Sequence, residues 1–322
     1  MKRHVLITGA AGFLGSYLVK HHAELGDRVY GVDNYSSSRP QSLHHKKLLA
    51  DFGNYFFMKA DISSPKFPFF FKEIPLDIIY NFACPASPPL YQKIPVETML
   101  TCVVGTKNIL SLASPKTVVV HASTSEVYGD PYVTPQQESY WGNVNPYGPR
   151  SCYDEGKRAA EALCYDYRMK YGVDARLVRI FNTYGPHMDV NDGRVITNFV
   201  KQIIDGTPLT VYGNGMQTRS FCYVTDLIRG ITSLAELSGN PETPINIGNP
   251  NEFTILDLAK KLQKKFGCDI EYRALPKDDP TQRKPNIELA QKLLCWKPKI
   301  DVDEGLDLTI DYIKSVYSPE EV

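Results

Sequence analysis

The chain has 322 residues, of which 43% are hydrophobic and 22% are charged, the composition of a globular protein. Its 36 lysines and arginines balance its 36 aspartates and glutamates, so no net charge favours nucleic acid or an anionic membrane. We therefore expect neither as a partner, and an anionic ligand must be held by local cations and backbone N–H groups.

Six apolar, β-branched runs alternate with helix-length amphipathic segments in the first part of the chain. We expect strands at residues 4–8, 28–32, 55–59, 77–82, 117–123 and 175–181. We expect the best-defined helices between them at residues 13–25, 95–113 and 151–171. This alternation is typical of an α/β fold with a Rossmann-type, doubly wound parallel sheet.

After residue 181 the alternation loosens, and glycine, proline and asparagine become frequent. We expect helices at 195–205 and 304–316, one opened by Asp226, and one that starts at Thr254 with a capping box. The sequence thus predicts a smaller mixed α/β lobe over residues 182–322, set against the carboxyl ends of the sheet. The first domain is expected over residues 1–181, with further core elements contributed by later residues.

The seven cysteines are scattered, without a Cys-x-x-Cys pair or histidines at zinc-ligand spacing. We therefore expect buried free thiols and no metal site. No apolar run is long enough to span a bilayer, and the first strand starts too early to leave room for a signal peptide. We expect a cytoplasmic protein, although a chain trimmed of an upstream anchor would look the same.

Glycines recur at every third position, Gly9, Gly12 and Gly15, directly between the first strand and the first helix. Such a turn brings backbone N–H groups and a helix N-terminus against a pyrophosphate. Asp33 closes the second strand, where a carboxylate accepts hydrogen bonds from a ribose diol and repels a 2′-phosphate. The loop therefore predicts NAD binding, with Asp61 near the adenine. The remaining expected NAD contacts are Phe13, Leu14, Asn34, Ile62, Thr101, Tyr153 and Lys157.

Tyr153 and Lys157 are four residues apart, so they share one face of the helix expected at 151–171. A free phenol has a pKa of about 10, but a neighbouring ammonium and a positively charged nicotinamide both favour the phenolate. Tyr153 could then take a proton from a sugar hydroxyl while the carbon gives hydride to NAD. Lys157 could also hold the nicotinamide ribose, and Thr124 could bridge the hydroxyl and Tyr153.

Six longer sequence motifs, spread over nearly the whole chain, resemble those of one known family. They lie at residues 82–88, 122–131, 140–158, 181–186, 192–195 and 217–221. In these stretches the chain resembles the UDP-glucuronate decarboxylase family of the extended short-chain dehydrogenases/reductases. The resemblance implies oxidation of C4 of UDP-glucuronate by NAD, loss of CO2 from the resulting β-keto acid, and return of the hydride to give UDP-xylose.

The resemblance also implies roles for single residues. Ser125 and Glu126 are expected near C5, which must be protonated, and Arg150 and Arg283 are expected to bind the carboxylate or diphosphate. The UDP part is expected to be held by Asn182, Arg194, Tyr212 and Arg219, with Ala86 and Tyr91 near the glucuronate. The family further implies a homodimer formed through the helices at 95–113 and 151–171.

Two positions depart from the family pattern. Cys102 stands where an asparagine is usual, and His187 stands where an arginine is usual. Any part that the usual residues play in holding cofactor or diphosphate is therefore open, and His187 could make its contact dependent on pH.

Three alternative functions stay open. A nucleotide-sugar 4-epimerase uses the same oxidation but does not need a carboxylate-binding arginine. A 4,6-dehydratase needs an aspartate where this chain has Ser125. A non-catalytic NAD-binding protein of this fold commonly lacks the tyrosine or the lysine, and both are present.

Overall fold

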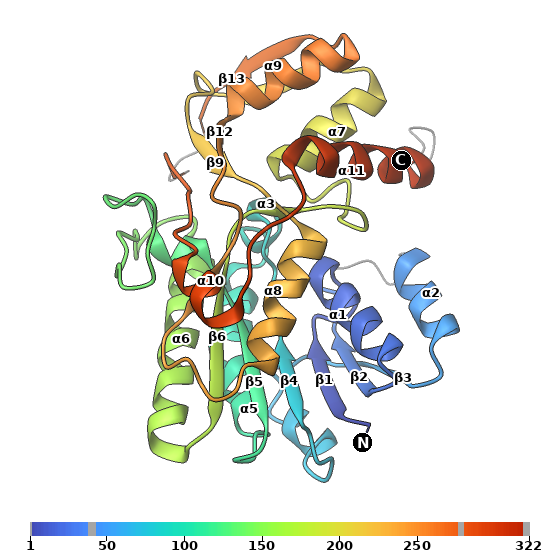
Figure 1. Ribbon diagram of the computed structural model, residues 1–322, viewed down its shortest axis with the longest axis vertical. Helices are drawn as coiled ribbons and strands as arrows, with labels where there is room; N and C mark the ends of the chain where they lie inside the picture. The colour runs from blue at the N-terminus through green and yellow to red at the C-terminus, as the bar shows by residue number, and fades with distance from the viewer. Residues whose placement is uncertain (1, 38–42, 276–279, 318–322) are drawn as a thin grey trace.

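The computed structural model describes residues 2–37, 43–275 and 280–317 (Figure 1). At its centre lies a seven-stranded sheet in the order β11-β6-β5-β4-β1-β2-β3, and every pairing is parallel. The strands are β1 (His4–Thr8), β2 (Arg28–Asp33), β3 (Tyr55–Lys59), β4 (Ile78–Asn81), β5 (Val118–Thr124), β6 (Asp174–Ile180) and β11 (Ile245–Ile247). The predicted doubly wound sheet is confirmed, and the strand order reverses between β1 and β4, which is where ligands bind in such folds.

The six strands expected from the sequence agree with the structure to within one residue at each end. The sequence analysis missed β11, because three residues carry little periodicity of their own. Its backbone pairs with β6, so a segment late in the chain completes the edge of the sheet.

Helices cover both faces of the sheet. They are α1 (Phe13–Glu24), α4 (Pro95–Leu100), α5 (Thr106–Leu110), α6 (Ser151–Tyr171) and α8 (Val224–Glu236), with α2 (Leu43–Asp51) beside the outer strands. Alternate residues of β1 face opposite sides, as a strand requires. Val5 joins the cluster that contains Leu18 of α1 and Leu227 of α8, whereas Leu6 joins the cluster that contains Ile109 of α5 and Cys164 of α6.

The helix expected at residues 95–113 runs without a break from Pro95 to Leu110 and ends three residues earlier than expected. A π-helical turn, η2 (Thr101–Gly105), separates α4 from α5, and α5 ends at Leu110. Such turns insert one residue into an α-helix and occur frequently at functional sites. Gly105 approaches Ile62 closely, since a Cβ there would lie 2.6 Å from Ile62 Cδ1.

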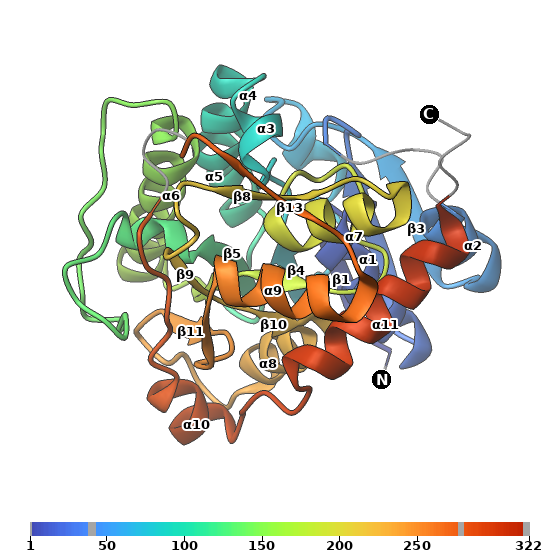
Figure 2. The ribbon, with the colours of Figure 1, turned by 90° about the horizontal axis from the view of Figure 1, so that it is seen from above.

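A second group of elements lies above the carboxyl ends of the sheet (Figures 1 and 2). It contains α7 (Val195–Asp205), α9 (Ile255–Phe266), α11 (Val302–Val316) and the parallel pair of β8 (Leu209–Tyr212) with β13 (Ile270–Arg273). The capping of α9 is confirmed, because Thr254 Oγ1 accepts a hydrogen bond from the Asp257 N–H at 2.9 Å. α11 starts two residues earlier than expected, since Asp301 caps it.

The remaining elements are short. They are η1 (Phe67–Phe70), α3 (Pro88–Tyr91), η3 (Ser125–Tyr128), β7 (Thr183–Tyr184), β9 (Thr218–Ser220), β10 (Cys222–Tyr223), β12 (Glu252–Thr254) and α10 (Glu288–Leu294). β7 pairs with β10, and β9 pairs with β12. In the apolar run around η1, Phe67 and Phe71 are buried, whereas Phe69 and Phe70 are exposed.

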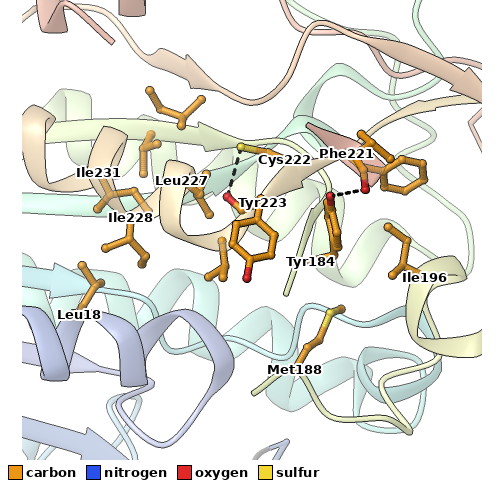
Figure 3. Packing of buried hydrophobic residues seen from close by; sticks show 14 of the residues in the cluster. Leu18, Tyr184, Met188, Ile196, Phe221, Cys222, Tyr223, Leu227, Ile228 and Ile231 are labelled. Carbon is orange, nitrogen blue, oxygen red and sulfur yellow. Dashed lines mark hydrogen bonds between the residues drawn. The ribbon is translucent and has the colours of Figure 1, made fainter. Parts of the chain in front are cut away.

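One buried cluster joins the sheet to the elements above it (Figure 3). Tyr184 and Tyr223 lie in the middle of this cluster, with Leu227 of α8 on one side and Ile196 of α7 on the other. Because both groups of elements share one core, the upper group is held firmly against the edge of the sheet.

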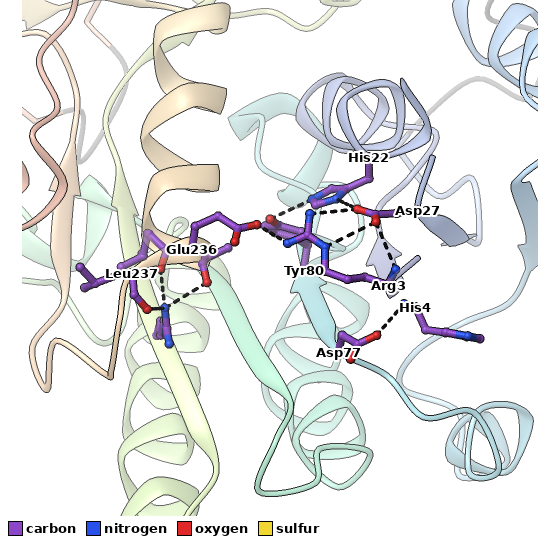
Figure 4. A network of polar contacts seen from close by, with 11 residues as sticks. Arg3, His4, His22, Asp27, Asp77, Tyr80, Glu236 and Leu237 are labelled. Carbon is purple, nitrogen blue, oxygen red and sulfur yellow. Dashed lines mark hydrogen bonds and ion pairs between the residues drawn. The ribbon is translucent and has the colours of Figure 1, made fainter. Parts of the chain in front are cut away.

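A polar network ties the opposite, amino-terminal edge together (Figure 4). Arg3 binds Asp27 at 3.0 Å and also pairs with Glu236 of α8. The buried ring of His22 bridges Asp27 at 2.8 Å and the Tyr80 hydroxyl at 3.0 Å. Burial lowers the pKa of His22 despite its bond to Asp27. The network lies far from the carboxyl edge and links α1, β4 and α8.

Candidate active site

A cavity of about 820 Å³ lies at the carboxyl edge of the sheet. Its walls come from the turn after β1, from the ends of β2, β4, β5 and β6, and from α6 and α7. The predicted site residues that line it are Gly9, Gly12, Phe13, Leu14, Gly15, Asp33, Asn34, Asp61, Ile62, Ala86, Tyr91, Thr101, Thr124, Ser125, Glu126, Arg150, Tyr153, Lys157, Asn182, Arg194, Tyr212 and Arg219. Arg283 is the one predicted site residue that does not line the cavity.

The glycine turn leaves no space for side chains. Gly9 has a φ of +70°, and a Cβ on Gly15 would lie 2.0 Å from the Gly9 carbonyl oxygen. α1 starts directly after Gly12 and has no side-chain cap, so its first N–H groups are available to a ligand in the cavity. This arrangement fits a diphosphate.

Asp33 is held in place at the end of β2. Its carboxylate accepts hydrogen bonds from the Ala11 N–H at 3.1 Å and the Tyr35 N–H at 2.8 Å. Nearby, Asn34 donates to Asp61 at 3.2 Å. These side chains surround the position expected for the adenosine ribose, so the residues present fit NAD.

Tyr153 and Lys157 face the same cavity from α6. The Tyr153 ring stacks on Tyr91 with 5.0 Å between centroids, and Lys157 Nζ lies 5.8 Å from the centre of the Tyr153 ring. Lys157 is buried and donates a hydrogen bond to the Ala122 carbonyl oxygen at 2.8 Å. A side chain fixed in this way can contribute its charge to the site without moving.

Burial raises the pKa of Tyr153 well above its ordinary value, and a hydrogen bond with Thr124 lowers it in part. The burial of the phenol, which the sequence does not reveal, opposes the effect of the neighbouring ammonium. The protein by itself therefore keeps Tyr153 protonated. The positive charge of oxidised NAD acts in the opposite direction.

Glu126 lies between two guanidinium groups. It pairs with Arg150, and Arg283 donates to its two oxygens at 3.3 and 3.2 Å. Burial raises the pKa of Glu126, but Arg283 and Arg150 outweigh burial and lower it to about 2. Glu126 is therefore ionised at neutral pH and cannot itself donate a proton unless these arginines move away.

Arg283 binds Glu126 from behind the cavity wall. Only 1% of its surface is exposed, and its backbone carbonyl accepts a hydrogen bond from the Ser220 hydroxyl at 2.8 Å. The expected direct contact between Arg283 and a substrate carboxylate does not fit this placement. Its position indicates a role in holding Glu126.

Sequence reasoning missed Asp154, the residue after Tyr153. Its side chain is buried, Oδ2 lies 3.7 Å from Arg150 Nε, and Oδ1 has no hydrogen-bond partner among the described residues. Burial and the neighbouring charge of Glu126 raise the pKa of Asp154 to about 7. The sequence offered one signal for this residue: Asp154 stands four positions after Arg150 on the same helix face.

His187 also lines the cavity. Its ring stacks on His44 with 3.5 Å between centroids, and Nδ1 lies 2.7 Å from the Tyr312 hydroxyl. Burial, followed by the charges of Lys20 and Lys47, lowers the pKa of His187 to about 4. The ring is therefore neutral near pH 7, and any pH dependence from it would fall in the acidic range.

Comparison with known proteins agrees with this geometry. The family model described as NAD dependent epimerase/dehydratase family matches residues 5–248. The chain belongs to this family. UDP-glucuronic acid decarboxylase 6 of Arabidopsis thaliana is 47% identical over 308 residues, covering 94% of this chain and 87% of the relative. UDP-glucuronic acid decarboxylase 1 of Xenopus tropicalis is 44% identical over 316 residues, covering 97% and 72%.

Among solved structures, a UDP-glucuronic acid 4-epimerase from Bacillus cereus in complex with UDP-glucuronic acid and NAD has a TM-score of 0.85. It is 27% identical, and the match covers 98% of this chain and 100% of the epimerase chain. The resemblance seen in the motifs is thus confirmed for the family, for the fold and for NAD as cofactor. Within the described residues, no group of three or more metal-ligating side chains occurs, and no helix is long and apolar enough to cross a bilayer.

We predict that Gly15→Ala weakens NAD binding at least tenfold, or about 1.4 kcal/mol, because its Cβ would collide with the Gly9 carbonyl. Gly53→Ala is the matched control, since a Cβ there meets open space. Titration calorimetry with NAD measures both variants. Equal affinities of Gly15→Ala and the control would contradict the proposed diphosphate contact.

We predict that Asp154 makes stability fall as the pH rises. Between pH 3.8 and about 7, the unfolded chain has lost the Asp154 proton while the folded protein retains it. The free energy of unfolding of the wild type, relative to Asp154→Asn, should therefore decrease over this range by roughly 2–4 kcal/mol. Urea unfolding at several pH values measures this difference.

The control for this prediction is Asp51→Asn on the exposed surface of α2, which should follow the wild-type pH profile. A difference between the wild type and Asp154→Asn that is flat, or that grows with pH, would show that Asp154 is not buried as an acid.

Proposed function

We propose that the protein is a UDP-glucuronate decarboxylase, which forms UDP-xylose and CO2. The observation that carries the proposal is the Arg150–Glu126 pair, which lies in the same cavity as Thr124, Tyr153 and Lys157. Thr124, Tyr153 and Lys157 can serve the oxidation of a sugar hydroxyl. Arg150 supplies a cation that can bind a sugar carboxylate in the same cavity. Identities of 44–47% with UDP-glucuronic acid decarboxylases support the same substrate and product.

NAD, when bound, supplies the hydride acceptor for C4 and the hydride donor for the final reduction. Gly12 and the start of α1 would hold its diphosphate, and Asp33 its adenosine ribose. Tyr153 takes the proton of the C4 hydroxyl, and Thr124 shares it through their hydrogen bond. Lys157 stabilises the phenolate by its charge.

Decarboxylation follows from the position of the new carbonyl. The C6 carboxylate lies β to the C4 carbonyl, so the electrons of the breaking C5–C6 bond move onto the C4 oxygen. Tyr153 can return its proton there and thereby stabilise the developing charge. Arg150, drawn from Glu126 to the substrate carboxylate, would orient that group before CO2 leaves.

C5 must then be protonated. Ser125 and Glu126 line the same part of the cavity, but the low pKa of Glu126 disfavours its carboxyl as the donor. We propose that the Ser125 hydroxyl, or a water molecule held by Glu126, delivers the proton to C5 and is reprotonated from solvent. The C4 hydroxyl of the enol gives its proton back to Tyr153, which returns it to the C4 oxygen in the final reduction. Arg283 keeps the Glu126 carboxylate in position from below.

For the UDP part, the proposed contacts are Asn182, Arg194, Tyr212 and Arg219, which line the part of the cavity formed after β6 and by the upper elements. Ala86 and Tyr91 face the proposed glucuronate position, and Tyr91 also supports the ring of Tyr153. We accordingly propose residues 182–322 as the UDP-sugar-binding lobe. Residues 1–181, together with α8 and β11, would form the NAD-binding domain.

The alternative functions are less well supported. A 4-epimerase would fit the structural likeness to the Bacillus cereus enzyme, but identity to the decarboxylases is much higher. Ser125 cannot act as the acid that a 4,6-dehydratase needs. A non-catalytic NAD-binding protein does not require Tyr153 and Lys157 buried side by side.

We also propose a homodimer in the cytoplasm. The helices α4 and α6, which contact each other, expose Val96, Leu100, Tyr165 and Met169, an apolar surface that a second copy would cover. All seven cysteines are free thiols, which suits a reducing compartment.

The product assay tests the function directly. Purified protein incubated with UDP-glucuronate and NAD, without added reductant, should release CO2 and UDP-xylose, as followed by NMR and mass spectrometry. Unchanged substrate after long incubation would refute the decarboxylase. Formation of UDP-galacturonate would favour the 4-epimerase instead.

Replacing the proposed base should separate chemistry from binding. We expect Tyr153→Phe to lower kcat by about 10²–10⁴-fold and to retain NAD binding, because only the hydroxyl is lost. Tyr147→Phe, at a position that is 96% exposed, is the matched control. A turnover rate of Tyr153→Phe equal to that of the control would exclude Tyr153 as the base.

A further inference from the structure

Two cysteines meet beside the proposed catalytic residues. Cys84, in the loop after β4, and Cys102, in the π-helical turn η2, have their sulfur atoms 3.3 Å apart. Cys84 is half-buried and lines the cavity, whereas Cys102 is buried behind it. A small molecule in the cavity can therefore reach the Cys84 thiol, but it cannot reach the Cys102 thiol that Cys84 contacts.

We propose that Cys84 and Cys102 form an oxidation site, which a peroxide converts into an intramolecular disulfide that stops turnover. This modification is independent of the substrate, but its effect on turnover rests on the proposed function.

The Cys84 thiol is the more acidic of the two, as its attack on a peroxide requires. The hydrogen bond between Cys84 and Cys102 lowers the pKa of Cys84, burial opposes this shift, and the Lys157 ammonium lowers the pKa further. The same hydrogen bond, together with burial, raises the pKa of Cys102. Because the thiolate is the nucleophile and Cys84, unlike the buried Cys102, lines the cavity that admits the peroxide, Cys84 is the thiol that attacks first.

The chemistry balances with the peroxide as the oxidant. The Cys84 thiolate attacks one peroxide oxygen, the O–O bond breaks, and Cys84 becomes a sulfenic acid while the other oxygen leaves as water after taking a proton. The Cys102 sulfur then attacks the Cys84 sulfur, its proton joins the departing hydroxyl, and a second water leaves. The two sulfurs together lose two electrons, which the peroxide gains.

Closure needs only a small movement. A disulfide bond is about 2.05 Å long, so the sulfurs must approach each other by about 1.2 Å. The loop that carries Cys84 is fixed at its start, because Thr8 Oγ1 accepts the N–H groups of Phe82 and Ala83 at 3.1 Å each. Most of the movement therefore falls on Cys102 and η2.

A shift of Cys102 acts on the residues proposed for catalysis. Cys102 packs directly against Gly156, where an added Cβ would lie 3.0 Å from Cys102 Cβ. Gly156 lies between Tyr153 and Lys157 on α6, so the turn that carries both side chains rests on Cys102. Drawing Cys102 toward Cys84 removes this support and changes the wall of the cavity beside Lys157.

Other cysteines of the chain are less suited to such a reaction. Cys164 and Cys222 are buried, and burial raises the pKa of both. Cys295 is exposed, directly follows the end of α10, and is not among the residues that line the cavity. Cys295 therefore serves as the matched control.

The test treats the full-length protein with hydrogen peroxide, with and without NAD, blocks free thiols by alkylation, and maps disulfides by mass spectrometry. We expect a peptide linking Cys84 to Cys102, at least a tenfold loss of turnover, and recovery of turnover with dithiothreitol. Disulfide mapping needs no substrate, so the modification can be established even if UDP-glucuronate is not turned over. In that case a tenfold change in NAD affinity on oxidation replaces turnover as the readout.

Variants separate the disulfide from general oxidative damage. Each is compared with its own untreated activity. Cys295→Ala should respond as the wild type does, whereas Cys102→Ala should lose activity several-fold more slowly and form no link from Cys84. Cys102→Ser replaces Cys102→Ala if the latter does not fold.

Three results would overturn the proposal. In the first, Cys84 and Cys102 are recovered as free thiols from the inactivated wild type. In the second, the Cys84–Cys102 disulfide forms but neither turnover nor NAD affinity changes. In the third, peroxide inactivates the Cys102 variants at the wild-type rate.

Discussion

The seven strands of the central sheet run parallel, so all their carboxyl ends meet at one edge. Side chains that follow different strands are therefore brought together although they are far apart in the sequence. Asp33 ends β2, Thr124 ends β5, and Asn182 follows β6. The crossover reverses direction between β1 and β4, which opens space for a ligand there. The cavity, the glycine turn and the position of α6, which carries Tyr153 and Lys157, all depend on this arrangement.

Burial and charge then divide the cavity into regions of different chemistry. Around Tyr153, burial keeps the phenol protonated until a positive charge is brought close to it. Around Glu126, two guanidinium groups outweigh burial and keep the carboxylate ionised. Next to the cavity wall, Asp154 lies beside Arg150 with one oxygen short of a hydrogen-bond partner, and burial raises its pKa to about 7. Three acidic groups close together thus have separate protonation states, which a site that moves protons requires.

The elements above the sheet are positioned by the core and not by a flexible connection. Tyr184 and Tyr223 belong to the same buried cluster as residues of β1 and α1. Shared packing therefore keeps the residues proposed to hold the UDP part in a fixed position relative to those proposed to hold NAD. The same close packing makes the site sensitive to small shifts, as the contact between Cys102 and Gly156 illustrates.

The sequence by itself determined the features that depend on local periodicity and spacing: the six longer strands, the glycine turn, Asp33, and the pairing of Tyr153 with Lys157 on one helix face. Only the tertiary structure decided which distant residues meet and how deeply each is buried. Arg283 reaches Glu126 across 157 residues and is covered by the fold, so it supports the carboxylate and does not line the cavity. Cys84, after β4, and Cys102, in η2, come into contact although they are 18 residues apart in the sequence. No spacing rule predicts such contacts, since they arise from the packing of the whole chain.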